Sequence, residues 1–461
     1  MRKLSLALGA LVSTLALGAG TALAAPEPGK DGAGDPYYPT DGNGGYDVSA
    51  YDVKLSYDPA TRGLDAIAKI TAKTTQELSR FNLDLRGLKV SSVKVNGQPA
   101  KFTRTGEHEL VITPASPLAK DAEIVVEVAY CGQPQPVRHP VTGLGGWRGT
   151  PSGGVIAAGA PHSASTWFPV NETPMDKATF TVTTTTPEGW HSVSNGTRNK
   201  PSTSNGKTTT TWTATDPVSP HLIMLGIDKW TFQESTVDST SVLSAFAPGS
   251  NGKALADKLP EVLKFLNGKL GDYHFGTVGS VHLADNLPYQ VGSQTRPVLG
   301  RNADLNALIR TLAAQWWGGS MSVENWADTC THECFANYLS WMWAEAKENK
   351  DLDAHYRKLV ESVRGNAAFW SRKLADPGRG KEFSAIYDKG ALFVHALRRK
   401  IGERAFATVL SNFPTINQGW NQGWHDLELY LEAEAQMDLK EFLAAWSHGT
   451  AIPADKHLFP A

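Results

Sequence analysis

The chain has 461 residues, a formal net charge of −2 and 41% hydrophobic residues. This length allows about two or three domains. The near-neutral charge argues against a strongly basic protein that binds nucleic acids or acidic membranes through its overall charge. Only three cysteines occur, Cys131, Cys330 and Cys334. An odd number in a secreted chain cannot form a complete disulfide framework, so we expect a fold that does not depend on disulfides.

Residues 1–24 have the three parts of a secretory signal peptide. A charged start with Arg2 and Lys3 precedes an apolar run over residues 4–17, and small residues end in the A-x-A pattern at Ala24. A membrane helix would need ~20 apolar residues, which this run does not supply. We therefore expect cleavage near Ala24 and secretion. No later segment has the length and apolar character of a membrane span.

Residues 25–45 are rich in Pro, Gly and Asp, which predicts a flexible linker without a core of its own. Residues 46–233 carry strand signals: alternating stretches, Thr- and Val-rich runs, and turns such as Asn96-Gly97. This part should form an all-β domain of stacked antiparallel sheets.

Helical periodicity dominates the second half of the chain, residues 234–461. In the first helical segment, Leu255, Leu259 and Leu263 recur on one face. We expect a mostly helical domain here. The predicted helices cover residues 252–271, 304–318, 327–347, 353–364, 390–400, 404–411 and 426–446.

Several short motifs follow one another along the chain. Residues 167–180 read W-F-P-V-N-E-T-P-M-D-K-A-T-F, and V-S-N-G follows at residues 193–196. Later come Q-T-R-P at residues 294–297, Y-D-K-G-A at residues 387–391 and a closing F-x-x-x-W-x-x-G from Phe442. In sequence and in order, these motifs resemble those of the aminopeptidase N family of zinc metallopeptidases. The resemblance covers about residues 46–461 and is to the short bacterial members.

The resemblance implies a multidomain α+β fold, in which an antiparallel β-sandwich or saddle precedes a thermolysin-like helical domain. It also implies a chemistry. Two His at i and i+4 of one helix and a Glu on the next helix hold zinc, and the Glu within H-E-x-x-H acts as general base for a zinc-bound water. A Tyr stabilises the oxyanion, and a loop Glu binds the free amine of the substrate.

Several of these positions carry other residues here. The H-E-x-x-H segment of the family falls on residues 310–318, where Arg310 replaces the first His, Thr311 the general base and Ala314 the second His. Two amine-contacting positions also differ. Gly292 stands in place of the loop Glu, and Ala160 stands where a Gln is usual.

Two positions keep the residue type of the family. Glu333 corresponds to the third zinc ligand and Tyr387 to the oxyanion-stabilising Tyr. One carboxylate is a small part of a zinc site, and Arg310 would repel the cation. We therefore predict no zinc at this position and no other cofactor. We predict instead that Arg310 replaces the ion and pairs with Glu333.

A second dense group of potential ligands comprises Cys330, His332, Glu333 and Cys334. It could be a relocated metal site, two buried cysteines that pack in the core, or an oxidised pair. We consider a disulfide unlikely here, because helical Cβ atoms at i and i+4 lie ~5–6 Å apart whereas a disulfide needs about 3.8 Å.

The sequence therefore predicts a secreted homologue without catalysis, which binds a peptide or a partner protein in the groove between its domains. The alternative is a hydrolase with a relocated metal around Cys330, His332, Glu333 and Cys334. Neither hypothesis includes a nucleic-acid partner.

Overall fold

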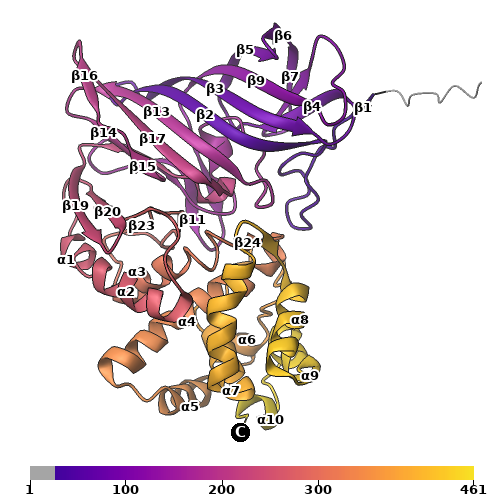
Figure 1. Ribbon diagram of the computed structural model, residues 1–461, viewed down its shortest axis with the longest axis vertical. Helices are drawn as coiled ribbons and strands as arrows, with labels where there is room; N and C mark the ends of the chain where they lie inside the picture. Colours follow the sequence, from indigo (N-terminus) through magenta and orange to yellow (C-terminus); the bar gives the residue numbers. More distant parts are fainter. Residues whose placement is uncertain (1–25, 461) are drawn as a thin grey trace, which may run out of the picture.

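A β-rich half and a mostly helical half follow one another along the chain, as the sequence predicts (Figure 1). This computed structural model describes residues 26–460, so the predicted signal peptide lies outside the described residues. Among the described residues, no helix combines the length and apolar character needed to cross a bilayer.

The largest sheet of the β half has nine strands and is antiparallel except for the pair β2 and β13. Buried and exposed residues alternate along β2 and β3, as expected for strands with one face on the core. Its strands are β2 (Tyr46–Asp58), β3 (Gly63–Thr74), β5 (Lys89–Val95), β6 (Gln98–Pro99), β9 (Glu123–Gly132), β13 (Ala178–Pro187), β15 (Thr197–Arg198), β16 (Ser202–Ser204) and β17 (Lys207–Val218).

Two smaller sheets complete the β half, and the buried apolar residues of all three form its core. The four-stranded sheet contains β1 (Glu27–Pro28), β4 (Leu78–Asp84), β7 (Lys101–Thr105) and β8 (Glu109–Thr113). The five-stranded sheet contains β10 (Pro136–His139), β11 (Gly143–Gly149), β12 (Val155–Ala158), β14 (His191–Ser194) and β18 (Leu225–Asp228). The short helices η1 (Ala164–Thr166) and η2 (Pro220–Leu222) lie between strands.

The segment before β2 differs from the predicted flexible linker, because its side chains are buried against both halves of the molecule. The Asp35 carboxylate accepts a hydrogen bond from the Trp326 backbone at 2.8 Å. The Tyr37 and Tyr38 hydroxyls donate to Asp376 at 2.6 Å and to Glu382 at 2.7 Å. Composition alone misses this packing, because the Gly- and Pro-rich residues around the two tyrosines dominate the pattern.

A small mixed sheet opens the second half. Its strands are β19 (Thr231–Val237), β20 (Thr240–Phe246), β21 (Thr277–Val278), β22 (Val281–His282) and β23 (Val298–Leu299). The predicted domain boundary at residue 233 falls inside β19, whose neighbours in the sheet all come later in the chain. The boundary therefore lies before Thr231. A short pair, β24 (Ser322–Val323) and β25 (Asn421–Gln422), lies farther on.

The helices follow the predicted apolar periodicity, with two differences. The helix predicted for 304–318 ends at Ala313. The last predicted helix breaks at Gln436, where φ is 52°. The predicted break between residues 400 and 404 is confirmed, because Gly402 has a non-helical φ of 80° and ψ of 161° and separates two helical parts of α7. The helices are α1 (Lys253–Ala256), α2 (Leu259–Leu270), α3 (Leu305–Ala313), η3 (Trp326–Asp328), α4 (Cys330–Glu348), α5 (Leu352–Val363), α6 (Ala367–Trp370), α7 (Lys389–Ile416), α8 (Trp424–Ala435), α9 (Lys440–Leu443), η4 (Ala444–His448) and α10 (Asp455–Leu458).

Two of the sequence motifs meet at the junction of the halves. The Asn195 side chain donates to the Gln294 backbone carbonyl at 2.5 Å, and the Gly196 N–H donates to the Thr295 hydroxyl at 2.8 Å. The buried Arg296 guanidinium donates to the Gly196 carbonyl at 3.0 Å. These contacts give V-S-N-G and Q-T-R-P a structural role, which is to fix one half against the other.

Candidate functional site

An ion pair joins α3 and α4. An Arg310 guanidinium nitrogen lies 3.2 Å from a Glu333 carboxylate oxygen, which confirms the predicted pair. A second guanidinium nitrogen donates to the Gln290 carbonyl at 2.8 Å. The Arg310 side chain is 5% exposed and that of Glu333 16%. The positive charge is therefore held inside the protein, on a carboxylate that has little access to water.

Two tyrosines complete the surroundings of this ion pair. The Tyr289 hydroxyl donates to the other Glu333 oxygen at 2.7 Å, so both carboxylate oxygens are occupied. The guanidinium carbon of Arg310 lies 5.2 Å from the centre of the Tyr289 ring and 5.0 Å from that of Tyr387, within the range of cation–π contacts. Burial and the neighbouring carboxylate raise the pKa of Tyr289, so its hydroxyl stays protonated and donates.

The other replaced positions lie close to this pair but offer no acid, base or metal ligand. The Thr311 hydroxyl donates to the Ala307 carbonyl at 2.8 Å and is therefore engaged by its own helix. Gly292 approaches Ala314 so closely that a Cβ on the glycine would lie 3.2 Å from that of the alanine. Ala160 comes from the β half and lines the same pocket.

A disulfide joins Cys330 and Cys334 at the start of α4, contrary to our expectation. The Cα atoms are 4.8 Å apart, within the range of about 4.4–6.8 Å that disulfides usually show. Cys330 is the first residue of α4, so the bond closes the first turn. Gly390 permits it, since a Cβ there would overlap the Cys334 sulfur. The bond also removes both thiolates from the relocated metal site considered above.

Thiol labelling measures this bond directly. Cys131 is the free cysteine and is partly exposed, whereas Cys330 and Cys334 are buried. We expect iodoacetamide to label the folded protein once, at Cys131. Unfolding alone should add no label, and unfolding with a reductant should add two, as counted by intact mass spectrometry. Two further labels without a reductant would show free thiols.

A pocket lies beside the ion pair, between the two halves of the molecule. Its cavity volume is about 50 Å³. The pocket is narrow and mostly apolar, and has the size of one modest side chain. It is lined by Ala160, His221, Leu222, Tyr289, Val291, Gly292, Ala314, Trp317, Gly318, Val323, Trp326, Thr329, His332, Glu333 and Phe383.

Two neutral imidazoles supply the polar atoms on one side of this pocket. His332 Nε2 and His221 Nδ1 have no hydrogen-bond partner within residues 26–460. Burial and the nearby Lys177 lower the pKa of each ring to about 3, so both rings are uncharged near neutral pH. Burial also lowers the pKa of Lys177 to about 7, and its amine donates to the Trp420 carbonyl at 2.8 Å.

The residues around Glu333 do not fit a zinc ion. A catalytic zinc site needs three protein ligands and one open position. Here one carboxylate is available, and an arginine and a tyrosine already occupy its two oxygens. In residues 26–460 the one group of three possible ligand residues lies elsewhere, in the β half. We therefore derive no chemical step through zinc.

Sequence reasoning located most of this site but missed three of its side chains. Tyr289 belongs to the loop aligned with the amine-binding segment, in which only Gly292 was predicted to matter. Lys177 belongs to the β-half signature, so a buried role could have been suspected. His221 lies in η2 with no ligand spacing around it, and nothing in the sequence marks it.

Models of two domains match the chain. The peptidase M1 N-terminal domain matches residues 48–222, and the peptidase family M1 domain matches residues 301–446.

Solved structures give the same result. An M1 zinc metallopeptidase from Deinococcus radiodurans is 25% identical, with a TM-score of 0.84 over 92% of this chain and 98% of that chain. A mutant of that protein, bound to a Tyr-Ser-Ala substrate, superposes with a TM-score of 0.83 at 25% identity and covers 92% of this chain and 99% of that chain.

Curated relatives match over a smaller share of their own length. Probable aminopeptidase 1 of Saccharolobus solfataricus is 21% identical over 428 residues, which cover 87% of this chain and 53% of that protein. Aminopeptidase M1-B of Oryza sativa is 26% identical over 150 residues, which cover 31% of this chain and 17% of that protein. The chain thus spans about half or less of the length of these relatives.

Proposed function

This chain belongs to the peptidase M1 family, and from that membership we propose that it is a secreted, non-catalytic member that binds a peptide or a protein segment between its two halves. The observation that carries the proposal is the Arg310–Glu333 pair. A guanidinium is permanently charged and suits a carboxylate. The Arg310 guanidinium therefore occupies the one acidic group that is left here to bind a metal.

The replaced positions support the absence of catalysis. Thr311 stands where the resemblance places a general base, and its hydroxyl is engaged by the Ala307 carbonyl. Gly292 and Ala160 offer no carboxylate or amide to a substrate amine. A ligand would therefore be held without activation of a water and without recognition of its N-terminus.

The pocket supports a ligand that inserts one side chain. Its apolar walls include Leu222, Val323 and Phe383. The unpartnered nitrogens of His221 and His332 can each exchange a hydrogen bond with a hydroxyl or amide group. An apolar or hydroxyl-bearing side chain of modest size fits this combination. A charged side chain does not, because it would lose its hydration in a mostly apolar pocket.

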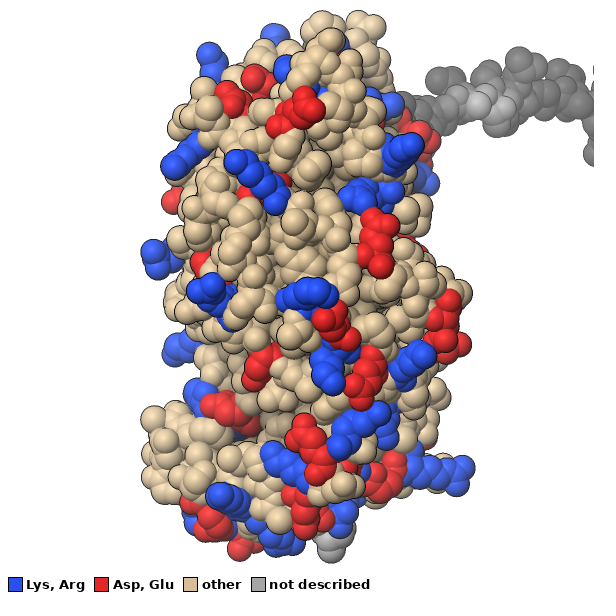
Figure 2. Space-filling view, turned by 90° about the vertical axis from the view of Figure 1, so that its left-hand side faces the viewer, with Lys and Arg blue, Asp and Glu red and all other residues tan. Residues whose placement is uncertain are grey.

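Charge and redox state support the proposed setting. On the face seen in Figure 2, Lys and Arg are interspersed with Asp and Glu, without the broad basic patch that nucleic-acid binding uses. The Cys330–Cys334 bond agrees with secretion, because disulfides persist mainly in oxidising compartments. The three-part pattern of residues 1–24 points to the same compartment.

A set of peptides with two kinds of N-terminus tests the proposed function. Each peptide is offered with a free and with an acetylated N-terminus, and binding to the purified protein is measured by fluorescence anisotropy. Because Gly292 and Ala160 cannot hold an amine, we expect paired affinities to differ by less than about tenfold, or 1.4 kcal/mol. A strong preference for free amines, or no binding by any peptide, contradicts the proposal.

A variant with a filled pocket shows where the peptides bind, and a surface variant serves as its matched control. Ala314→Phe places a ring in the pocket and should abolish binding of every positive peptide. Ala368→Phe adds the same ring to the exposed surface of α6 and should leave binding unchanged. Equal affinities for the two variants would show that peptides bind elsewhere on the protein.

A further inference from the structure

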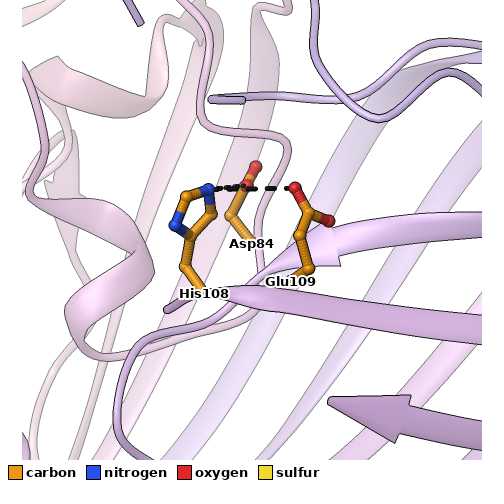
Figure 3. Close-up of side chains that lie close together, drawn as sticks. All are labelled: Asp84, His108 and Glu109. Carbon is orange, nitrogen blue, oxygen red and sulfur yellow. Dashed lines mark ion pairs between the residues drawn. The ribbon is translucent and has the colours of Figure 1, made fainter. Parts of the chain in front are cut away.

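A buried acidic cluster lies in the β half, away from the pocket. Asp84 ends β4, Glu109 begins β8, and His108 precedes it (Figure 3). One ligand atom from each of these three residues lies within 4.8 Å of the others. Asp84 and Glu109 are direct partners across the antiparallel pair β4 and β8. Two buried carboxylates opposite each other repel and destabilise a sheet unless a positive charge separates them.

The oxygens of this cluster are unsatisfied. Asp84 Oδ1 and both Glu109 carboxylate oxygens have no hydrogen-bond partner in the part of the chain that the structure describes. The other Asp84 oxygen accepts from the Glu172 backbone at 2.8 Å, so Oδ1 is the atom left for the cluster. The side-chain oxygens of the neighbouring Asn43 and Asn82 are unpartnered as well. A buried polar group without a partner costs about 1–3 kcal/mol, and a charged one costs more.

The imidazole of His108 does not satisfy these carboxylates. Its Nε2 lies 2.9 Å from the Thr40 carbonyl, which takes the single proton that this atom can donate. The same nitrogen is 3.5 Å from Asp84 and 3.8 Å from Glu109, beyond good hydrogen-bond distance.

We propose that Asp84, His108 and Glu109 bind a divalent metal ion. Carboxylate oxygens suit calcium, manganese and zinc, and an imidazole nitrogen suits the last two. The ion would bring two positive charges between the opposed carboxylates and ligate the unpartnered oxygens. To become a ligand, His108 Nε2 gives up its proton to the unpartnered Nδ1 of the same ring.

The surroundings allow such an ion to enter and give it a structural role. A surface pocket reaches His108 of the cluster, and its lining also includes Thr40, Asp41 and Arg86. Asp41 lies 3.7 Å from His108 Nε2 and belongs to the segment before β2. An ion here would fasten that segment to β4 and β8. The site is unrelated to the position around Glu333, so it stands whether or not the proposed peptide binding is correct.

Calorimetric titration of chelator-treated protein with calcium, manganese and zinc chloride tests the site. We expect one ion to bind per chain and the melting temperature to rise with ion concentration, because the ion stabilises the folded state. No binding of any of the three ions up to about 1 mM, the weak end of known calcium sites, would overturn the proposal.

Amide substitutions locate the ion. Asp84→Asn combined with Glu109→Gln keeps the shapes, removes the repulsion and so should fold, as circular dichroism will verify. Ion affinity should fall by about 10–100-fold or more. His108→Gln separates the ion types, because it should weaken manganese and zinc strongly but calcium little. Undiminished affinity for all three ions in the Asp84→Asn, Glu109→Gln protein would overturn the proposal.

Two control variants keep the cluster intact. Asp176 is another buried carboxylate of the β half, held by the Val48 backbone at 3.0 Å, and Asp176→Asn should leave ion affinity unchanged. Glu333→Gln removes the acid at the family's metal position and should also leave it unchanged. Loss of the ion with Glu333→Gln, but not with the cluster variants, would place the metal at α4 and refute this assignment.

Discussion

Purified protein is expected to show no chelator-sensitive aminopeptidase activity: it should not release the N-terminal residue of aminoacyl reporter substrates. Loss of a general base alone lowers rates by about 10²–10⁴-fold. Here the positions of the base and of two ligands carry Thr311, Arg310 and Ala314, and the remaining Glu333 is paired with Arg310. Chelator-sensitive turnover that copurifies with the chain would show this expectation to be wrong.

Restoring the zinc-binding motif by mutation tests the same expectation. The combined changes Arg310→His, Thr311→Glu and Ala314→His rebuild H-E-x-x-H on α3, across from Glu333 on α4. This variant should bind one zinc ion at the rebuilt site, measured as the increase over the original protein by elemental analysis. Adding Glu333→Gln should remove most of that zinc. If the triple variant gains none, the helices no longer hold the geometry that the family uses.

The second large effect concerns stability. Arg310→Ala should lower the free energy of unfolding by about 3–5 kcal/mol, the usual cost of breaking a buried ion pair. The substitution leaves Glu333 charged and mostly buried, with the Tyr289 hydroxyl as its remaining partner. It also removes a guanidinium that packs between the rings of Tyr289 and Tyr387. Urea unfolding followed by circular dichroism measures the loss.

A double-mutant cycle separates the pair from simple loss of packing. Arg310→Met keeps much of the side-chain volume, and Glu333→Gln keeps the shape of the acid. Together they should cost clearly less than the sum of the two single changes, because each single change leaves one buried charge without its partner and the double change leaves none. Arg364→Ala, which breaks an exposed pair with Glu361 on α5, should have little effect. Additive single effects would mean that Arg310 and Glu333 are not coupled.

Much of the architecture could be predicted because it depends on local patterns. Alternation along β2 and β3 and leucine spacing in α2 report which face is buried, and the structure agrees at each. The Arg310–Glu333 pair could be predicted because the resemblance placed both residues at ligand positions that face one zinc ion from adjacent helices. In each case a regular element carried the side chain.

The sequence-based predictions failed where segments that are distant along the chain meet. Nothing local distinguishes Tyr37 and Tyr38 from exposed linker residues, because their partners are far along the chain, at Asp376 and Glu382. The Cys330–Cys334 bond depends on closure of the first turn of α4 and on the missing side chain of Gly390. The cluster of Asp84 and Glu109 depends on strand register, which the sequence alone does not set.

The buried tyrosines of the segment before β2 constrain the order in which the chain assembles during synthesis. The hydrogen bonds of Tyr37 and Tyr38 span 339 and 344 residues. A ribosome adds about 5–20 residues per second, so the partners emerge tens of seconds after the tyrosines. The sheets of the β half, including β1, have all their strands by then, but Tyr37 and Tyr38 must wait for Asp376 and Glu382. Docking of the two tyrosines is therefore a late step of folding, taken after helices α1 to α6 have been made.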